Sequence, residues 1–290
     1  MEDTIKNGEN ILKKQKIVKY TSKTLIYIFL IVVAITTLFP FYWMINTSLK
    51  SNYDYRNQNP QTFLPSTWHF ENYQLAFQNG FSEYLINTLI VGITSTILGL
   101  IFTILAAYAF ARLHFKGKDF LFSAMLATMM IPGELFQITN FITVNQLQWT
   151  NSYIALIVPF LVSIFYIYLL RNNFKQIPNE LYYAAKVDGT SDMKYLWRVM
   201  VPLSMPTITS ITILKLMGSW NSYIWPRLVN VTGPKMVTNW IMNAFKDANG
   251  ETSIPMRMAG VVIVSLPLFL VFVFFRKYIM RGVSRSGTKG

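Results

Sequence analysis

Six long apolar runs restrict what this chain of 290 residues can fold into. A helix needs about 20 apolar residues to cross the roughly 30 Å hydrocarbon core of a bilayer, and each run has close to that length. Among Asp, Glu, Lys and Arg, the runs contain two residues, Glu134 and Lys215, and no others. The sequence therefore predicts an all-α integral membrane protein with six transmembrane helices. The predicted spans are residues 24–45, 84–111, 120–142, 152–170, 202–224 and 258–275.

The main alternative is a soluble protein with a large core. Helices of such a protein show polar faces with a period of about 3.6 residues, whereas these runs are apolar all round. Charged residues make up 13% of the chain, against about 25% in a typical soluble domain. The chain has no Cys, which excludes disulfides, Cys-based metal sites and Cys nucleophiles.

Lys and Arg residues are concentrated on one side of the predicted membrane. Of 26 basic residues, 19 lie in the two terminal segments and in the two connections on the same side, and 6 lie on the other side. The positive-inside rule makes the richer side cytoplasmic, so both termini are predicted there. Because the bases flank spans instead of forming one patch, no nucleic-acid partner is expected. The predicted organisation is a cytoplasmic segment 1–23, a transmembrane domain 24–280 with a cytoplasmic loop 171–201, and a cytoplasmic tail 281–290.

The cytoplasmic loop 171–201 predicts two short helices joined at a sharp bend. Pro178 suits the first turn of a helix, and Gly189 supplies a stop at its end. Ser191 can cap a second helix. Such a loop either connects two spans along the membrane surface or offers small alanines to the surface of a partner. One face of the first helix is expected to carry Leu181, Ala184, Ala185 and Asp188.

The stretch IPNELYYAAKVDGTS, followed by WRVMVPLSMP, resembles the Glu-Ala-Ala coupling loop of permease subunits in ATP-binding-cassette importers. Ala184, Ala185, Asp188, Gly189 and the segment 202–206 match that pattern. Other stretches resemble the carbohydrate branch of the family, and in particular its maltose-type second permease. They are AYAFARLHFKG (107–117), MMIPGE (129–134), GSWNSYIWP (218–226) and KYIMRGVSRSGTKG (277–290).

The chain departs from the family pattern at two positions. Tyr183 stands where the motif has its Glu, and Glu180, one turn earlier, is the acid that could take over the contact with the ATPase. Ser222 stands where the family often has an acid after the GSWN segment.

The resemblance implies a type I importer permease fold in a bacterial-type cell membrane. It implies four partners besides lipid: a second homologous permease, a cytoplasmic ATPase dimer, an extracellular solute-binding protein and a sugar. The loop 178–200 would dock on the ATPase. The chain has no G-x-x-x-x-G-K-[ST] phosphate cradle, so ATP and Mg²⁺ are expected on the partner ATPase. No cofactor, metal site or catalytic residue is expected in this chain.

Ionisable residues inside a membrane are expensive and mark functional sites. Glu134 and Lys215 are expected at similar depth, where they either approach one another or line a wet path. The alternative is that Lys215 snorkels and Glu134 lies in the outer interface, beyond the Pro132–Gly133 break. Sugars are bound by aromatic rings and amides, which makes Trp220, Asn221, Tyr223, Gln137 and Asn140 further candidates for the translocation path. Interfacial anchoring explains the Trp and Tyr equally well.

Two rival functions are considered. A membrane-embedded enzyme lacks a plausible site, because His69 and His114 are predicted on opposite sides of the membrane and no G-x-S-x-G or H-E-x-x-H motif is present. A secondary transporter would usually show more spans and paired broken helices from internal repeats, and it has no use for a coupling loop. ATP-dependent against gradient-dependent uptake distinguishes the two kinds of transporter.

Overall fold

The computed structural model describes residues 2–58, 61–246 and 250–284, with side chains described for 20–58, 61–246 and 250–276. Over these residues the chain is helical, and no β-strand is present apart from one isolated bridge between Lys246 and Thr252. The prediction of an all-α protein is confirmed. The last part of the predicted tail, 285–290, lies outside the described residues.

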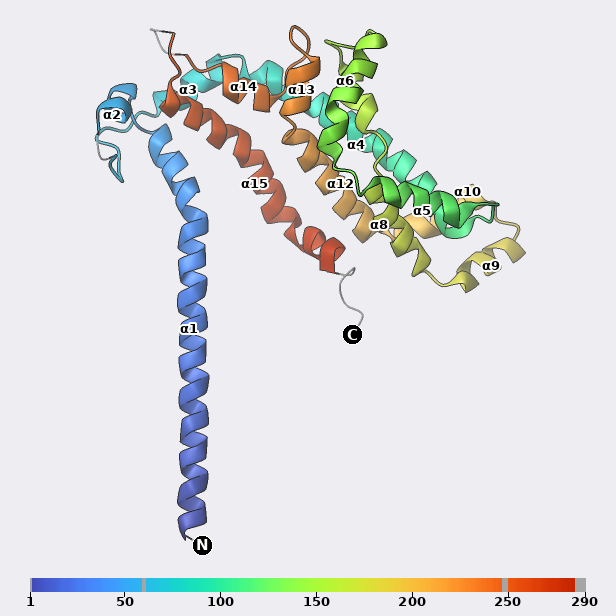
Figure 1. The fold of residues 1–290 in the computed structure, drawn as a ribbon, viewed down its shortest axis with the longest axis horizontal. Helices are drawn as coiled ribbons and strands as arrows, with labels where there is room; N and C mark the ends of the chain where they lie inside the picture. The colour runs from blue at the N-terminus through green and yellow to red at the C-terminus, as the bar shows by residue number, and fades with distance from the viewer. Residues whose placement is uncertain (1, 59–60, 247–249, 285–290) are drawn as a thin grey trace.

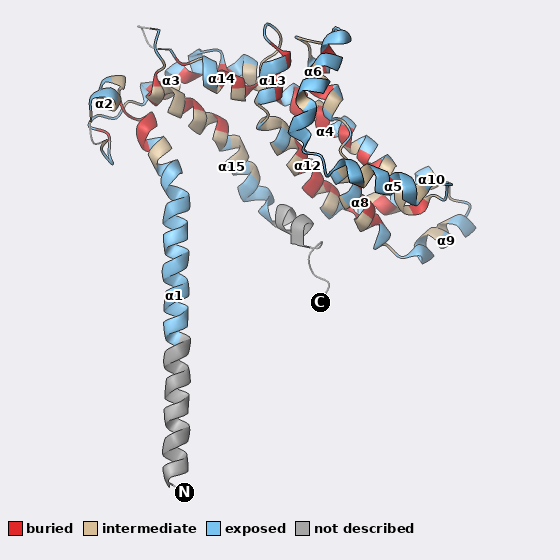
Figure 2. Cartoon of the chain, in the orientation of Figure 1, coloured by how far each residue is buried: buried red, intermediate tan, exposed pale blue. Residues whose placement is uncertain are grey.

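Three helices are long and apolar enough to cross a membrane as single elements. They contain the predicted spans 24–45, 84–111 and 258–275, and Figure 1 shows α1 projecting far from the other helices. In α1 most side chains from Tyr20 to Ile45 are exposed (Figure 2), as expected where lipid takes the place of water. The three elements are α1 (Glu2–Ser48), α4 (Phe81–Arg112) and α15 (Ile254–Ser284).

The other three predicted spans are pairs of helices bent at a short break, so the chain has six spans if each pair counts as one. The first pair, bent by 79°, joins α5 (Lys118–Thr128) to η1 (Gly133–Leu135) and α6 (Phe136–Gln146). Pro132 lies in this break, where its missing N–H and fixed φ end helical bonding.

The second pair, bent by 43°, joins α7 (Tyr153–Ile157) and η2 (Val158–Phe160) to α8 (Ile164–Lys175). The helix α8 continues past residue 171, the expected start of the cytoplasmic loop, and ends at Lys175.

The third pair is bent most, by 81° at Ser204. Pro202 lies just before the bend and Pro206 in the first turn after it. The elements are α10 (Asp192–Tyr195), the π-helical turn η3 (Leu196–Met200), α11 (Val201–Leu203) and α12 (Met205–Trp220). The predicted span 202–224 corresponds mainly to α12, and the bend lies near its expected start, where Pro202 and Pro206 flank Ser204.

Short helices lie along the upper edge of the molecule and at its right-hand end (Figure 1). The upper edge carries α2 (Asn52–Asn57), α3 (Glu71–Gln78), α14 (Val237–Asn243) and α13 (Ile224–Val229). The right-hand end carries α9 (Asn179–Val187) beside α10.

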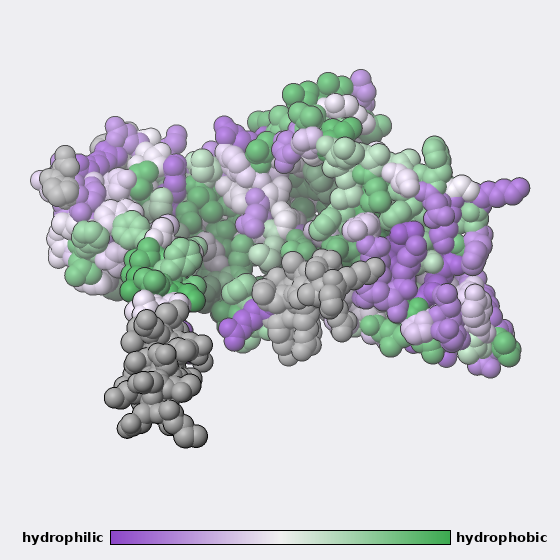
Figure 3. Space-filling model, turned by 60° about the horizontal axis from the view of Figure 1, so that its bottom comes forward, coloured by the Kyte–Doolittle hydropathy of each residue, from purple (hydrophilic) through white to green (hydrophobic). Residues whose placement is uncertain are grey.

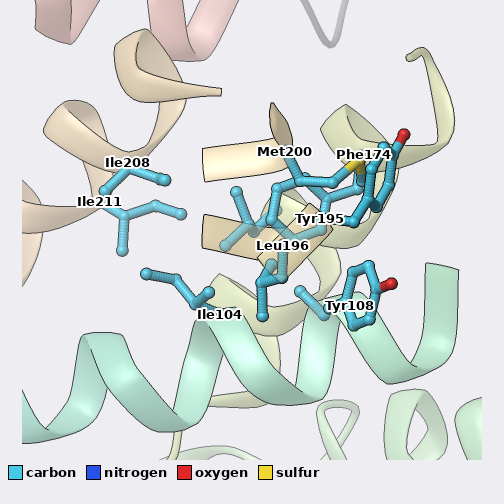
Figure 4. Packing of buried hydrophobic residues seen from close by; sticks show 10 residues of the cluster. Ile104, Tyr108, Phe174, Tyr195, Leu196, Met200, Ile208 and Ile211 are labelled. Atoms are coloured by element: carbon cyan, nitrogen blue, oxygen red, sulfur yellow. The ribbon is translucent and has the colours of Figure 1, made fainter. Parts of the chain in front are cut away.

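A core of apolar side chains lies next to α9 and α10, where α4, α8 and α12 meet η3 (Figure 4). Leu170 and Phe174 of α8 and Leu196 and Met200 of η3 are fully buried there. Ile211 contributes from α12. This packing fixes the position of the elements against which α9 packs.

Candidate functional site

The helix α9 begins after Pro178 and ends in the turn that the sequence predicts. Gly189 has φ +67°, a conformation that strains any residue with a Cβ. The Gly189 N–H donates to the Lys186 carbonyl at 3.0 Å, and the Thr190 N–H donates to the Ala185 carbonyl at 2.8 Å. These two bonds form a Schellman stop. Ser191 then caps α10, accepting the Lys194 N–H at 3.4 Å, as predicted.

The face of α9 that points away from the protein is uncovered, and it carries apolar side chains beside the acid Glu180. Val187 is 88% exposed and Tyr183 is 62% exposed. Ala184 is exposed between them, whereas Ala185 turns inward and packs against the core beside α10. The two alanines of the motif therefore have different roles, since one is available to a partner and the other holds the helix in place. Leu181, Glu180 and Asp188 are also exposed.

Asp192 ties α9 to the rest of the protein. Its Oδ1 accepts hydrogen bonds from the hydroxyls of Tyr108 at 3.0 Å and Tyr182 at 2.9 Å. Its Oδ2 lies 3.0 Å from the ammonium of Lys186, and this bond raises the pKa of Lys186 above its ordinary value. One carboxylate thus joins α4, α9 and α10. No sequence pattern signals this role, because Tyr108 is 84 residues away in the chain.

Arg112, the last residue of α4, makes a second connection. Its side chain is buried, and it donates to the carbonyl oxygen of Phe174 at 2.9 Å. It also donates to the Ile177 carbonyl and to the side-chain oxygen of Asn179. A cation at the C-terminal end of α8 is favoured by the helix dipole. Arg112 therefore fixes the entry of α9 to the end of a spanning helix.

Hydrophilic residues gather at the end of the molecule that carries α5, α9 and α10, while hydrophobic residues prevail in the middle (Figure 3, right and centre). The exposed apolar residues of α9 thus stand at a polar end of the molecule. An apolar patch with a polar rim is typical of a protein interaction site.

Lys215 lines a cavity of about 410 Å³ between α4, η2, α8, α12 and α13. The lysine is 9% exposed and therefore nearly buried. Hydroxyl groups share the cavity wall with aromatic rings. The polar and aromatic lining consists of Ser95, Ser163, Tyr166, Ser219, Ser222 and Trp225.

The ammonium of Lys215 lies 5.3 Å from the ring centroid of Tyr166. In the part of the chain that the structure describes, it has neither a hydrogen bond nor an ion pair with an acid. Gly99 of α4 leaves room for it, since a Cβ there would overlap with Lys215 Nζ. The desolvation of this charge is offset only by one aromatic face.

Glu134 lies elsewhere. It is exposed on η1, at the break after Pro132, and no ion pair joins it to Lys215 within the described residues. Of the two possibilities for these charges, the structure places Lys215 on a cavity and Glu134 off it. The part of either residue in a translocation path stays a prediction.

The candidates for sugar binding do not line the cavity of Lys215. The Trp220 indole N–H donates to the Val264 carbonyl at 3.2 Å and packs against α15, so its ring serves the fold. Asn221 is exposed at the end of α12, and Asn140 and Gln137 are half-buried on α6. Tyr223 accepts a hydrogen bond from Arg227 at 2.5 Å. Their roles in transport stay predictions.

Straight and broken apolar helices around a partly polar cavity define this chain as a membrane transport component. It belongs to the family described as binding-protein-dependent transport system inner membrane component, whose pattern matches residues 99–285. The family resemblance drawn from the coupling loop is confirmed. The protein is a multi-pass component of the bacterial inner membrane.

Relatives span nearly the whole chain. The arabinooligosaccharides transport system permease protein AraQ of Bacillus subtilis (strain 168) is 29% identical, over 91% of this chain and 94% of its own length. The diacetylchitobiose uptake system permease protein NgcG of Streptomyces coelicolor is 28% identical, over 89% and 86%. A probable ABC transporter permease of Mycoplasma pneumoniae, the MG189 homolog, is 31% identical, over 87% and 83%.

The fold has a counterpart among solved structures. A chain of a bacterial ABC transporter involved in the import of the acidic polysaccharide alginate superposes with a TM-score of 0.77. The match covers 87% of this chain and 94% of the other, at 22% sequence identity. At that identity the likeness concerns the fold.

Proposed function

We propose that this chain is the permease subunit that carries a carbohydrate through the membrane and couples transport to a separate ATPase through α9. The observation that carries the proposal is the mounting of α9. Its outer face is uncovered and carries Tyr183, Ala184 and Val187 beside Glu180, while its inner side is held by Asp192 and Arg112 to α4 and α8. A partner that grips α9 thereby gains a stiff connection to two spanning segments.

The partners follow from the family and from what the chain lacks. A binding-protein-dependent system requires a solute-binding protein, and the chain has no phosphate cradle for ATP. We therefore expect an ATPase dimer that binds ATP and Mg²⁺, and a second permease that completes the path. ATP-driven closure of the ATPase dimer would favour one of two arrangements of the spans, because the closed dimer binds the two arrangements with different affinity.

A carbohydrate cargo is supported by the relatives, which include permeases for arabinooligosaccharides and diacetylchitobiose. The cavity beside Lys215 has hydroxyl and indole groups on its wall, a lining suited to a polar ligand with apolar ring faces. Its volume of about 410 Å³ falls within the usual range of roughly 300–1,000 Å³ for ligand pockets.

Substitutions on the outer face of α9 test the coupling. Ala184→Arg and Val187→Glu are expected to lower ATP-dependent uptake in proteoliposomes at least about tenfold, because each places a charge in a desolvated contact. Ala184→Ser and Val187→Leu, at the same positions, should leave uptake near the wild-type level. These sites are cleaner than Ala185 or Gly189, whose substitution also disturbs packing or strains the turn.

The assembled complex supplies the control. All four variants should insert and co-purify with the second permease, while the two charged variants should lose the ATPase. Normal uptake by Ala184→Arg and Val187→Glu would contradict docking through α9. Uptake driven by an ion gradient without ATP would contradict the importer itself.

A further inference from the structure

The buried cations of the described chain donate hydrogen bonds to oxygen atoms of the protein, with the exception of Lys215. Lys50 donates to Gln61 Oε1 at 3.2 Å and to the Thr62 carbonyl at 2.9 Å. The guanidinium of Arg171 donates to the Phe110 carbonyl at 3.1 Å. Arg112 has the three acceptors described above. The exception is Lys215. The buried charged residues of the described chain are Lys50, Arg112, Arg171 and Lys215, so no acid is among them.

A buried ammonium without an acceptor is costly, and a fold that keeps one needs a reason. The contacts of Lys215 within its own chain do not supply that reason. The Tyr166 ring offers only its face, and Gly99 offers only space. Because Lys215 lines the cavity, a ligand held there can supply the missing negative charge.

The environment of Lys215 also indicates what kind of anion fits. One ammonium balances the single charge of a carboxylate, whereas a phosphate carries about −1.5 to −2 and calls for further cations. No second basic residue lines the cavity. The hydroxyls of Ser95 and Ser219 and the indole of Trp225 on the same wall suit the hydroxyls and ring faces of a sugar.

We propose that Lys215 binds a carboxylate of the transported carbohydrate, so that the cargo of this permease is an acidic, uronic-acid-containing oligosaccharide. The proposal rests on the proposed function, since it names the substrate class of the same transporter. It assigns specificity to this subunit and to one residue of α12.

A carboxylate of the second permease is the competing source of negative charge. The position of Lys215 argues against it. The amine lies against α4 at Gly99 and α8 at Tyr166, two helices of its own chain, and the side chain is more than nine-tenths buried without any partner present. A small ligand reaches such a site more readily than a side chain of another subunit.

The first experiment pairs a ligand change with a residue change. The complete transporter, with its own binding protein, is reconstituted in proteoliposomes and supplied with trimers of galacturonate, mannuronate or glucuronate. Each trimer is compared with its methyl ester, at concentrations that saturate the binding protein. Lys215→Met is expected to lower uptake of the acidic form about 30-fold or more, and uptake of the ester less than about threefold.

The second experiment restores the charge chemically, and the absence of cysteine in the chain makes it specific. Lys215→Cys should lose uptake of the acidic trimer as Lys215→Met does. Treatment with 2-aminoethyl methanethiosulfonate attaches an ammonium by disulfide exchange, with methanesulfinate leaving, and should restore uptake. Methyl methanethiosulfonate attaches a neutral group and should not. The wild-type complex, treated in the same way, controls for thiols of the other subunits.

Each outcome bears on one proposal. Equal losses for acid and ester, or rescue by the neutral reagent, would overturn carboxylate binding while leaving the importer intact. So would a binding protein that takes up neutral sugars alone. Loss of the second permease on purification of Lys215→Met would assign the missing charge to that subunit. Absence of any ATP-dependent sugar uptake by the wild type would instead overturn the proposed function.

Discussion

Arg112 and Lys215 are two buried cations that lie in very different surroundings. Arg112 meets three oxygen acceptors from α8 and from the segment leading into α9. Lys215 meets one aromatic ring and a cavity. Both charges are largely removed from water, so the acceptors decide what each charge does. Arg112 is part of the fold, whereas Lys215 is left with binding capacity that the chain itself does not use.

The largest effect should come from replacing Arg112, the buried cation that has hydrogen-bond acceptors in its own chain. Arg112→Met leaves the carbonyls of Phe174 and Ile177 and the amide of Asn179 without their donor, at a cost of about 3 kcal/mol in the free energy of unfolding. The melting temperature of the purified complex should fall, and amide exchange of α9 should speed up. Lys215→Met is the matched control and should melt at or above the wild-type temperature. A lower melting temperature for Lys215→Met than for Arg112→Met would reverse the comparison.

Crowding the unsatisfied cation comes next. In Gly99→Ala the new Cβ would overlap with Lys215 Nζ and lie 2.7 Å from the Leu161 carbonyl oxygen. Overpacking of this kind costs about 1–3 kcal/mol, which thermal melting can measure. In a Lys215→Leu background the same substitution should cost less, because only the Leu161 contact remains. Equal costs in the two backgrounds would show that the amine does not occupy the space beside Gly99.

A smaller effect is expected at the hub of α9, which is Asp192 with its partners Tyr108, Tyr182 and Lys186. Asp192→Asn keeps the side chain's shape but removes the charge that accepts from Tyr108, Tyr182 and Lys186, a loss of about 1 kcal/mol. Hydrogen exchange should increase in α9 and α10 and remain unchanged around Lys215. An equal increase in hydrogen exchange across the whole protein would mean that Asp192 does not act locally.

The smallest effect should come from the exposed member of that hub, Lys186→Met. The bond with Asp192 raises the pKa of Lys186 above its ordinary value of 10.5. The stabilising contribution is therefore fully present below pH 10.5 and is lost as the pH rises through the raised pKa. Between pH 6 and 9, the difference in melting temperature between wild type and variant should stay constant. A difference that disappears within this range would contradict a raised pKa.

Local chemistry was predictable from the sequence, and long-range contacts were not. The stop at Gly189 and the cap at Ser191 depend on residues within one turn, and both are confirmed. The inward turn of Ala185 depends on a core that α9 meets only after folding. The anchors Arg112 and Asp192 act across 62 to 84 residues of sequence, where no periodicity signals them.

The charges within the spans illustrate the same limit. The cost of an ion in lipid drew attention to Lys215, and the structure places this residue on a cavity. The depth argument for Glu134 assumed a continuous helix, and the 79° bend after Pro132 removes that assumption. Tyr166, the neighbour of Lys215 in space, carries no sequence signal, because an aromatic residue in an apolar run is ordinary.

The separateness of α1 has a consequence in time as well as in space. Among the side chains described from Tyr20 onward, the first buried one in this helix is Asn46, near its end, so most of the apolar part before it lies clear of the rest of the chain. The helix can therefore enter the bilayer without waiting for the segments that follow it. The basic residues that precede the span then fix its orientation first. Later segments, with their bends and buried charges, are inserted beside an anchor that is already in place.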